Sequence, residues 1–249
     1  QAMARDLPEV EAATSLSPWN GVGQSNETVK VENVEAEILF QEPNFFFVDS
    51  TFLDVFQLEV IAGDKDALRK PWNLVITDKM AKKYFGNEDP IGRELNVNDM
   101  PVEIAAVIKG MPDKSHFHIQ GLVSYVTIKN INPSNPWFTW EDFGHFNYIK
   151  TKSGVDPSKL EAKIPEWVLS YLNWPQSYRA SLLEGDYQFA LQPIEEIHLS
   201  SHLRWELENN GNILYVYILT GTLIFLLLIV CINYINLTTA KSLERAREV

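Results

Sequence analysis

The sequence predicts a mixed α/β domain of the α+β class, followed by one transmembrane helix. Two observations lead to this prediction. Segments rich in aromatic and β-branched residues alternate with short amphipathic segments through most of the chain, which is typical of a mixed fold. Charged residues then disappear between Glu208 and Lys241, although they are spread throughout the rest of the sequence. A folded polar domain joined to an apolar helix accounts for both patterns.

Strands and helices are predicted in a clear order before the apolar run. Strand character is found at residues 7–16, 31–50, 73–77, 89–97, 102–110, 121–128, 146–152 and 186–194. Helix character is found at residues 50–60, 78–86 and 156–172. Thr77 is expected to cap the second helix and Gly86 to end it. Asp156 is expected to cap the third helix, and Pro165 is expected to kink it.

Composition excludes several classes of function. The chain has 249 residues and a formal net charge of −12, which argues against a nucleic-acid partner and against an electrostatic grip on anionic lipid. Cys231, within the apolar run, is the single cysteine, so an intrachain disulfide and a thiolate zinc cluster are both impossible. The acidic balance itself favours solubility and identifies no partner.

The apolar run predicts a membrane span. Ile213 to Ile232 contains no charged residue and is long enough to cross a hydrocarbon core as a helix. The alternative is a buried core helix, although such helices usually keep a polar stripe. The positively charged residues follow the run, so the positive-inside rule places them in the cytoplasm and the domain outside. These topology and coupling residues are Lys241, Arg245 and Arg247.

Polar residues interrupt the inner end of the predicted span. Asn233 and Asn236 are three residues apart and share a helix face, and Thr239 follows them. Amides are costly against lipid, so we expect these residues to pack against other helices of a bundle. The alternative is that the chain from Asn233 onward already lies among the headgroups. Aromatic residues flank the run at Trp205, Tyr215, Tyr217 and Tyr234, as in an aromatic belt.

Two pairs of histidines are the candidates for a metal site. His116 and His118 would share one face of a strand, and His198 and His202 would lie one helical turn apart. Ordinary structural histidines are the alternative, because no carboxylate completes a metal-binding motif. The sequence contains no G-x-S-x-G motif, P-loop or dinucleotide fingerprint. We therefore expect no catalytic, cofactor-binding or metal-ligating residue.

Aromatic residues are concentrated in the segment "NPWFTWEDFGHFNYI". One interpretation is a local mini-core that holds a long loop in place. The other is a contact patch for a partner, lipid or a hydrophobic substrate. The candidate contact residues are Trp137, Phe138 and Trp140.

Four stretches together resemble a known family. They are "FFFVDSTFLDVFQLEVIAGD", "VITDKMAKKYFGNEDPIGRELNV", "VIKGMPDKSHFHIQGLVS" and "CINYINLTTAKSLERAREV". In this order they are similar to the periplasmic core domain of MacB-like, FtsX-type ABC transporter permeases, followed by a membrane helix. The chain has Ala106-Val107 where that family usually has Gly-Val. The motif residues serve turns and caps, so no active site is carried over from the family.

The resemblance implies a division of the chain. A porter-like subdomain would comprise residues 1–60 and 120–203, with an inserted β-rich subdomain at residues 61–119. A stalk and transmembrane helix would follow at residues 204–240, and residues 241–249 would begin the cytoplasmic part. Residues 1 to about 210 would lie in the periplasm of a bacterium.

The resemblance also implies partners and a function. The permease would form a dimer in the inner membrane with a second copy or half, within the lipid bilayer. A cytoplasmic ABC ATPase, on a separate chain or domain, would bind the ATP. The outer domain would relay ATP-driven motion to cargo or to an adaptor in the periplasm, with no enzyme activity of its own. The alternatives are the ligand-sensing domain of a single-pass receptor and a membrane-tethered metallohydrolase that uses His116 and His118.

Overall fold

The chain forms two compact units. The computed structural model describes residues 1–21, 28–131, 144–172, 175, 179, 189–201, 203 and 205–247. The first unit, the sheet domain, comprises Gln1–Pro193 and Leu203–Glu208. The second unit, the helical unit, comprises Ile194–His202 and Asn209–Val249.

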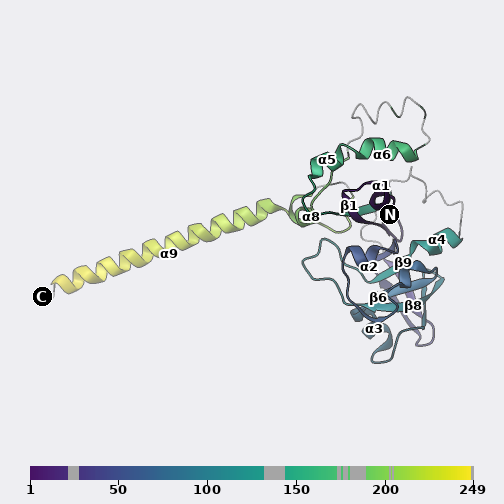
Figure 1. Ribbon diagram of the computed structural model, residues 1–249. Coiled ribbons are helices and arrows are strands. Elements are labelled where there is room, and N and C mark those ends of the chain that lie inside the picture. The colour runs from purple at the N-terminus through teal and green to yellow at the C-terminus, as the bar shows by residue number, and fades with distance from the viewer. Residues whose placement is uncertain are drawn as a thin grey trace. The chain divides into compact units, whose positions relative to one another are not determined.

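One mixed sheet organises the sheet domain (Figure 1). Its described strands are β1 (Val10–Pro18), β2 (Val29–Asn33), β3 (Ile38–Glu42), β4 (Phe45–Val48), β5 (Val60–Gly63), β6 (Asn73–Thr77), β7 (Glu94–Val97), β8 (Met100–Ile108), β9 (Gly121–Ser124) and β10 (Phe146–Thr151). They run in the order β10-β1-β4-β9-β6-β8-β7-β2-β3, and β5 also pairs with β8. The β4–β9 and β6–β8 pairs are parallel, and the other pairs are antiparallel.

Short helices connect these strands, and a long helix ends the chain. The sheet domain contains α1 (Ala2–Asp6), α2 (Phe52–Val55), the 3-10 helix η1 (Ala67–Arg69), α3 (Asp78–Phe85), α4 (Tyr125–Ile131), α5 (Pro157–Glu161) and α6 (Ile164–Tyr171). The helical unit contains α8 (Ile194–Ser200) and α9 (Ile213–Arg247). The predicted fold class, a mixed α/β domain followed by one apolar helix, is confirmed. The finer division at residues 60, 120 and 203 stays a prediction.

The central strands are buried on both faces. All four residues of β4 are buried, and so are all four of β9. Successive residues of β4 enter different clusters, with Phe45 and Phe47 in one and Phe46 and Val48 in the other. Side chains of a strand alternate between its two faces, so the sheet has an apolar core on each side.

Helix α3 follows the signals in its sequence. The Thr77 hydroxyl accepts a hydrogen bond from the Met80 amide at 3.3 Å, which caps the first turn. Gly86 ends the helix with φ at 63°. The buried Glu42 carboxylate then ties the helix to β3, because it accepts hydrogen bonds from the Tyr84 hydroxyl at 2.9 Å and from Lys83 Nζ at 2.5 Å. Burial, and after it the bond to Glu42, raises the pKa of Tyr84.

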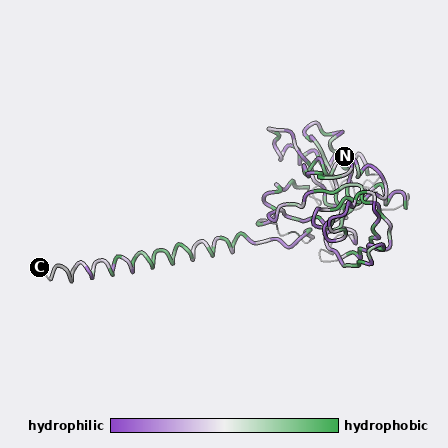
Figure 2. Tube along the Cα trace, turned by 90° about the horizontal axis from the view of Figure 1, so that it is seen from below, coloured by the Kyte–Doolittle hydropathy of each residue, from purple (hydrophilic) through white to green (hydrophobic). Residues whose placement is uncertain are grey.

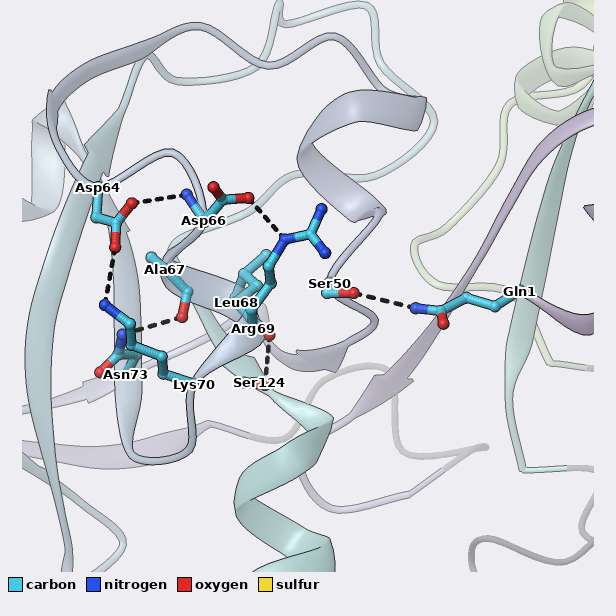
Figure 3. A network of polar contacts seen from close by, with 10 residues as sticks. All are labelled: Gln1, Ser50, Asp64, Asp66, Ala67, Leu68, Arg69, Lys70, Asn73 and Ser124. Carbon is cyan, nitrogen blue, oxygen red and sulfur yellow. Dashed lines mark hydrogen bonds and ion pairs between the residues drawn. The ribbon is translucent and has the colours of Figure 1, made fainter.

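A polar network holds the connection between β5 and β6 (Figure 3). The buried Ser124 hydroxyl donates to the Leu68 carbonyl at 2.6 Å, and the Asn73 amide donates to the Ala67 carbonyl at 2.9 Å. Exposed ion pairs surround η1, and pairs of this kind contribute little stability. They join Asp66 to Arg69 and Asp64 to Lys70. The buried hydroxyl is therefore the contact that fixes η1 against β9.

Several predicted elements differ from the structure. The strand predicted over 121–128 ends at Ser124 and continues as α4, because the Ser124 hydroxyl accepts the Val126 amide at 3.2 Å, as a helix cap does. The helix predicted over 156–172 is two helices, because Pro165 lacks the amide hydrogen that a continuous helix requires. The strand predicted over 31–50 is three strands, with turns at residues of positive φ, Glu37 and Asn44. Of the strand predicted over 186–194, the described part contains no strand.

Two glycines are required where strands and side chains meet closely. Gly63 pairs with Ala106 and has φ at 86°, and a Cβ atom there would lie 2.2 Å from the Ala105 carbonyl oxygen. At Gly121 a Cβ atom would lie 2.3 Å from the Phe45 ring. The family-like glycine of the "VIAGD" segment is therefore a packing requirement, and the buried Ala106 fits opposite it.

We predict that Gly63→Ala lowers the free energy of unfolding by about 2–4 kcal/mol, because it adds a steric clash to the strain of a positive φ. The matched control is Gly154→Ala, where φ is 78° and the space is open. Strain alone should lower the stability of this control by about 1 kcal/mol. Urea unfolding of the detergent-solubilised protein, followed by tryptophan fluorescence, measures both effects. Equal losses in the two variants would contradict the packing argument.

Candidate membrane-coupling site

Helix α9 has the length and composition of a membrane span. It runs for 35 residues, and Ile213–Ser242, 30 residues, is long and apolar enough to cross a bilayer. This stretch rises about 45 Å at 1.5 Å per residue, which exceeds a hydrocarbon core of about 30 Å. Its large apolar side chains are exposed, and Figure 2 shows the apolar colouring along it. The alternative of a core helix packed inside the protein therefore does not describe α9.

Aromatic residues mark two levels along α9. Tyr215 and Tyr217 lie in its first two turns, and Tyr234 lies toward its other end; all three are exposed. The rise from Tyr215 to Tyr234 is about 28 Å, close to the thickness of a hydrocarbon core. This spacing fits one tyrosine at each membrane boundary, and Asn233 lies next to the second of these levels.

Four hydroxyl groups of α9 have partners within the helix. Thr222 donates to the Ile218 carbonyl at 2.8 Å, and Thr239 donates to the Ile235 carbonyl at 2.8 Å. Thr238 and Ser242 bond in the same way to the residues four positions earlier. Such bonds satisfy a hydroxyl in an apolar environment without another helix.

The side-chain amides of Asn233 and Asn236 differ from these bonded hydroxyl groups. Within the part of α9 whose side chains are described, Asn233 and Asn236 form no hydrogen bond through their side chains. A carboxamide carries two donor hydrogens and an acceptor oxygen, which its own helix backbone cannot satisfy together. The amides of Asn233 and Asn236 therefore depend on groups outside α9, which other helices or lipid headgroups would supply. Thr239, predicted to join them, already has a partner in its own helix, and the packing role of all three stays a prediction.

The basic residues follow on the same helix. Lys241 is exposed, and the backbone of α9 continues through Arg245 to Arg247. A positively charged side chain in the last turns of a helix is also favoured by the helix dipole. The proposed topological role of these residues stays a prediction.

The start of α9 is tied down within the helical unit. The Asn212 side chain accepts the Leu214 amide at 2.8 Å, which caps the helix. Just before it, the Gly211 amide donates to the His198 carbonyl at 2.8 Å, and the Asn210 side chain donates to the Ser201 carbonyl at 3.4 Å. The end of α8 and the start of α9 are thus held together.

Between these two helices, the chain contributes a short segment to the sheet domain. Leu207 is buried in the same cluster as Phe117. The Glu208 carboxylate accepts the His118 amide at 2.7 Å, lies 2.9 Å from His118 Nδ1, and accepts the Asn44 side chain at 3.2 Å. We call Leu207 and Glu208, with Asn44 and His118, the clasp.

The two histidines of the "SHFHI" segment have separate partners. The segment contains no strand, as expected of a loop, and residues 115–117 form bends, so the two rings do not share the strand face that the metal-site candidate required. His116 Nε2 lies 3.0 Å from the Tyr148 hydroxyl, and the His118 ring faces Glu208. Burial, and after it the charge of Glu206, raises the pKa of Tyr148. The arrangement ties loops to the sheet.

Of the other candidate residues, one lies in the helical unit and the rest lie outside the described residues. His198 lies in α8 and is exposed, whereas His202 lies outside the described residues. The predicted contact aromatics Trp137, Phe138 and Trp140 also lie outside them.

Sequence reasoning missed both the cap and the clasp. An asparagine just before an apolar run is a recognisable capping signal, so Asn212 was within its reach. Leu207 and Glu208 carry no such local signal, because their partners lie some ninety to one hundred and sixty positions earlier in the chain. Only the fact that Glu208 is the last charged residue before the span pointed to it.

The fold and the helix define a class of protein: a mixed α/β domain attached to a candidate membrane span. The sequence profile of the MacB-like periplasmic core domain matches residues 1–167, and the chain belongs to that family. No curated protein matches the sequence.

Solved structures of three related domains resemble parts of this chain. A domain of a candidate permease protein from Porphyromonas gingivalis has a TM-score of 0.58 and 23% identity, covering 72% of this chain and 71% of that one. The periplasmic region of MacB from Actinobacillus actinomycetemcomitans has a TM-score of 0.45 and 15% identity, covering 68% and 89%. The extracellular domain of the noncanonic ABC-type transporter YknZ from Gram-positive bacteria has a TM-score of 0.48 and 17% identity, covering 68% and 80%. The likeness to the domain from Porphyromonas gingivalis concerns the fold alone.

We predict that Cys231 is protected by lipid. Its side chain is exposed in the structure, so only a bilayer or a neighbouring helix would shield it. In nanodiscs a water-soluble maleimide should leave Cys231 unlabelled, and denaturation in SDS should make it reactive. The control is Ser153→Cys, at an exposed position of the sheet domain, which should react at once. Rapid labelling of Cys231 in nanodiscs would contradict a span at this position.

Proposed function

We propose that the chain is the outer domain and one membrane helix of an ABC transporter permease of the bacterial inner membrane. The observation that carries this proposal is the family match over residues 1–167 in a chain that continues into the span of α9. The domain lies in the periplasm, and the helix passes through the lipid. The domain relays motion of the membrane helices to cargo or to an adaptor protein.

The energy for this motion comes from a partner. The sequence has no P-loop, so ATP is bound by a cytoplasmic ABC ATPase on another chain or domain. Lys241, Arg245 and Arg247 follow the span and place its end in the cytoplasm by the positive-inside rule. Motion started by ATP binding then reaches the outer domain through α9, with the chain itself performing no catalysis.

The two amides of α9 support a bundle over a solitary anchor. Carboxamides are costly where a helix faces hydrocarbon, so a helix that only holds a domain at the membrane is better served by apolar residues there. Asn233 and Asn236 share a face, and hydrogen bonds across a helix pair would satisfy both. The partner helices belong to the same permease or to its second copy or half.

We predict that an ABC ATPase copurifies with this protein. The protein should be tagged, extracted from native membranes with a mild detergent, and its partners identified by mass spectrometry. A P-loop ATPase at a fixed ratio, with ATP hydrolysis in the purified complex, is the expected result. Copurification of a signalling enzyme in its place would favour the receptor alternative and contradict the proposal.

We predict that changing Asn233 and Asn236 together to Leu weakens the bundle and leaves the sheet domain folded. Two interhelical hydrogen bonds of about 0.6 kcal/mol each correspond to roughly fivefold to tenfold weaker association. Recovery of the ATPase complex after dilution in detergent, together with ATP-dependent hydrogen exchange of the sheet domain, measures the effect.

The matched control for this variant replaces Thr222 and Thr238 by Val. It also removes two polar groups from α9, but their hydroxyls are already bonded within the helix. The control should keep the complex intact. Normal association of the Leu variant, at normal expression, would show that the amides do not hold the bundle.

A further inference from the structure

The clasp includes a segment of the sheet domain that lies, in sequence, between two parts of the helical unit. Leu203–Glu208 belongs to the sheet domain, whereas α8 before it and Asn209 after it belong to the helical unit. The residues that flank this segment belong to the helical unit and bond to one another. The Gly211 amide donates to the His198 carbonyl, and the Asn210 side chain donates to the Ser201 carbonyl. Only four residues, 209–212, separate Glu208 from the first turn of α9. A displacement of α9 therefore reaches Glu208 almost directly through the chain.

Asn44, which bonds to Glu208, lies next to a central strand of the sheet. Asn44 immediately precedes β4, and its carbonyl accepts the Gln120 amide at 3.0 Å, just before β9. Strands β4 and β9 are parallel neighbours, buried on both faces. Force on Glu208 is thus applied to the start of two packed central strands and not to a flexible surface loop.

The chemistry of the clasp allows it to open. Its apolar part, Leu207, is buried beside Phe117, but its polar part is accessible to water. The side chains of His118 and Glu208 are 36% and 28% exposed, respectively. Water can therefore replace the hydrogen bonds of the carboxylate, which a fully buried pair would not permit at comparable cost.

A second contact supports the same region. His116 precedes Phe117 and lies 3.0 Å from the hydroxyl of Tyr148, in β10. The two histidines of the "SHFHI" segment thus join the loop to different parts of the sheet domain, His118 to Glu208 and His116 to β10.

From this placement we propose that Glu208 is the releasable joint through which movement of α9 acts on the sheet domain. Its carboxylate, held by His118 and Asn44, couples the membrane helix to β4 and β9 when closed. When it is open, α9 moves without the domain. This inference rests on the proposed function, since the movement of α9 is the one that an ATPase would drive.

The first test needs no ATPase. The full chain in nanodiscs should be compared with Glu208→Ala and His118→Ala by hydrogen–deuterium exchange of residues 203–212. Glu208→Ala loses every hydrogen bond of the carboxylate and should accelerate exchange in this segment by about tenfold. His118→Ala should accelerate it less, because the His118 backbone amide still donates to Glu208. Glu196→Gln, an exposed carboxylate in α8, is the matched control and should leave exchange unchanged. Unchanged exchange in Glu208→Ala would overturn the joint.

The variants must also act through one contact. In the double variant Glu208→Ala with His118→Ala, exchange should be no faster than in Glu208→Ala alone, because the His118 ring then has no carboxylate to contact. Additive acceleration would overturn the assignment of His118 as the partner of Glu208. Unchanged exchange in the central strands β4 and β9 shows that each variant is folded.

The second test uses the copurified ATPase with magnesium and ATP. In the native protein, ATP should change exchange both in α9 and in the sheet domain. In Glu208→Ala the change in α9 should persist, while the change in the sheet domain is lost. An equal response of the sheet domain in Glu208→Ala would overturn the joint and leave the proposed function standing. Absence of any ATP response in the native protein would instead count against the proposed function.

Discussion

Burial of the central strands on both faces is the constraint on which the sheet domain depends. Because β4 and β9 are apolar on each side, a shift of one residue would exchange the two clusters that contain Phe45 and Phe46. The register is therefore fixed by packing. The turn at Asn44 and the close approach at Gly121 follow from that register, and so does the position of the surface to which Glu208 binds.

The sequence predicted the elements whose signals are local. The cap of α3 at Thr77 and its end at Gly86 depend on neighbouring residues, and both are as expected. The change from β9 to α4 was missed because "GLVSYVTI" is β-like in composition, whereas the Ser124 hydroxyl, which also bonds to Leu68, starts a helix there. Tertiary contact overrode propensity in this case.

In the candidate site, too, the features with local sequence signals were predicted and the contacts between distant residues were not. The apolar span, its tyrosines and its amides were visible because composition and helical periodicity report them directly. The partners of Glu208 were not visible, because His118 and Asn44 are distant in sequence and meet it only through the sheet. The pairing predicted for His116 and His118 assumed a strand, and the bends of the backbone separate their partners.

The continuity of α9 past Tyr234 has a geometric consequence. Thirteen further residues carry the helix to Arg247, about 20 Å beyond the inner tyrosine at 1.5 Å per residue. Neither a proline nor a glycine interrupts this part, so it behaves as a stiff arm. Tilting such an arm by about 10° about the level of Tyr234 moves Arg247 through roughly 3 Å. A small displacement at Arg247 would thus be enough to reorient α9 as a whole.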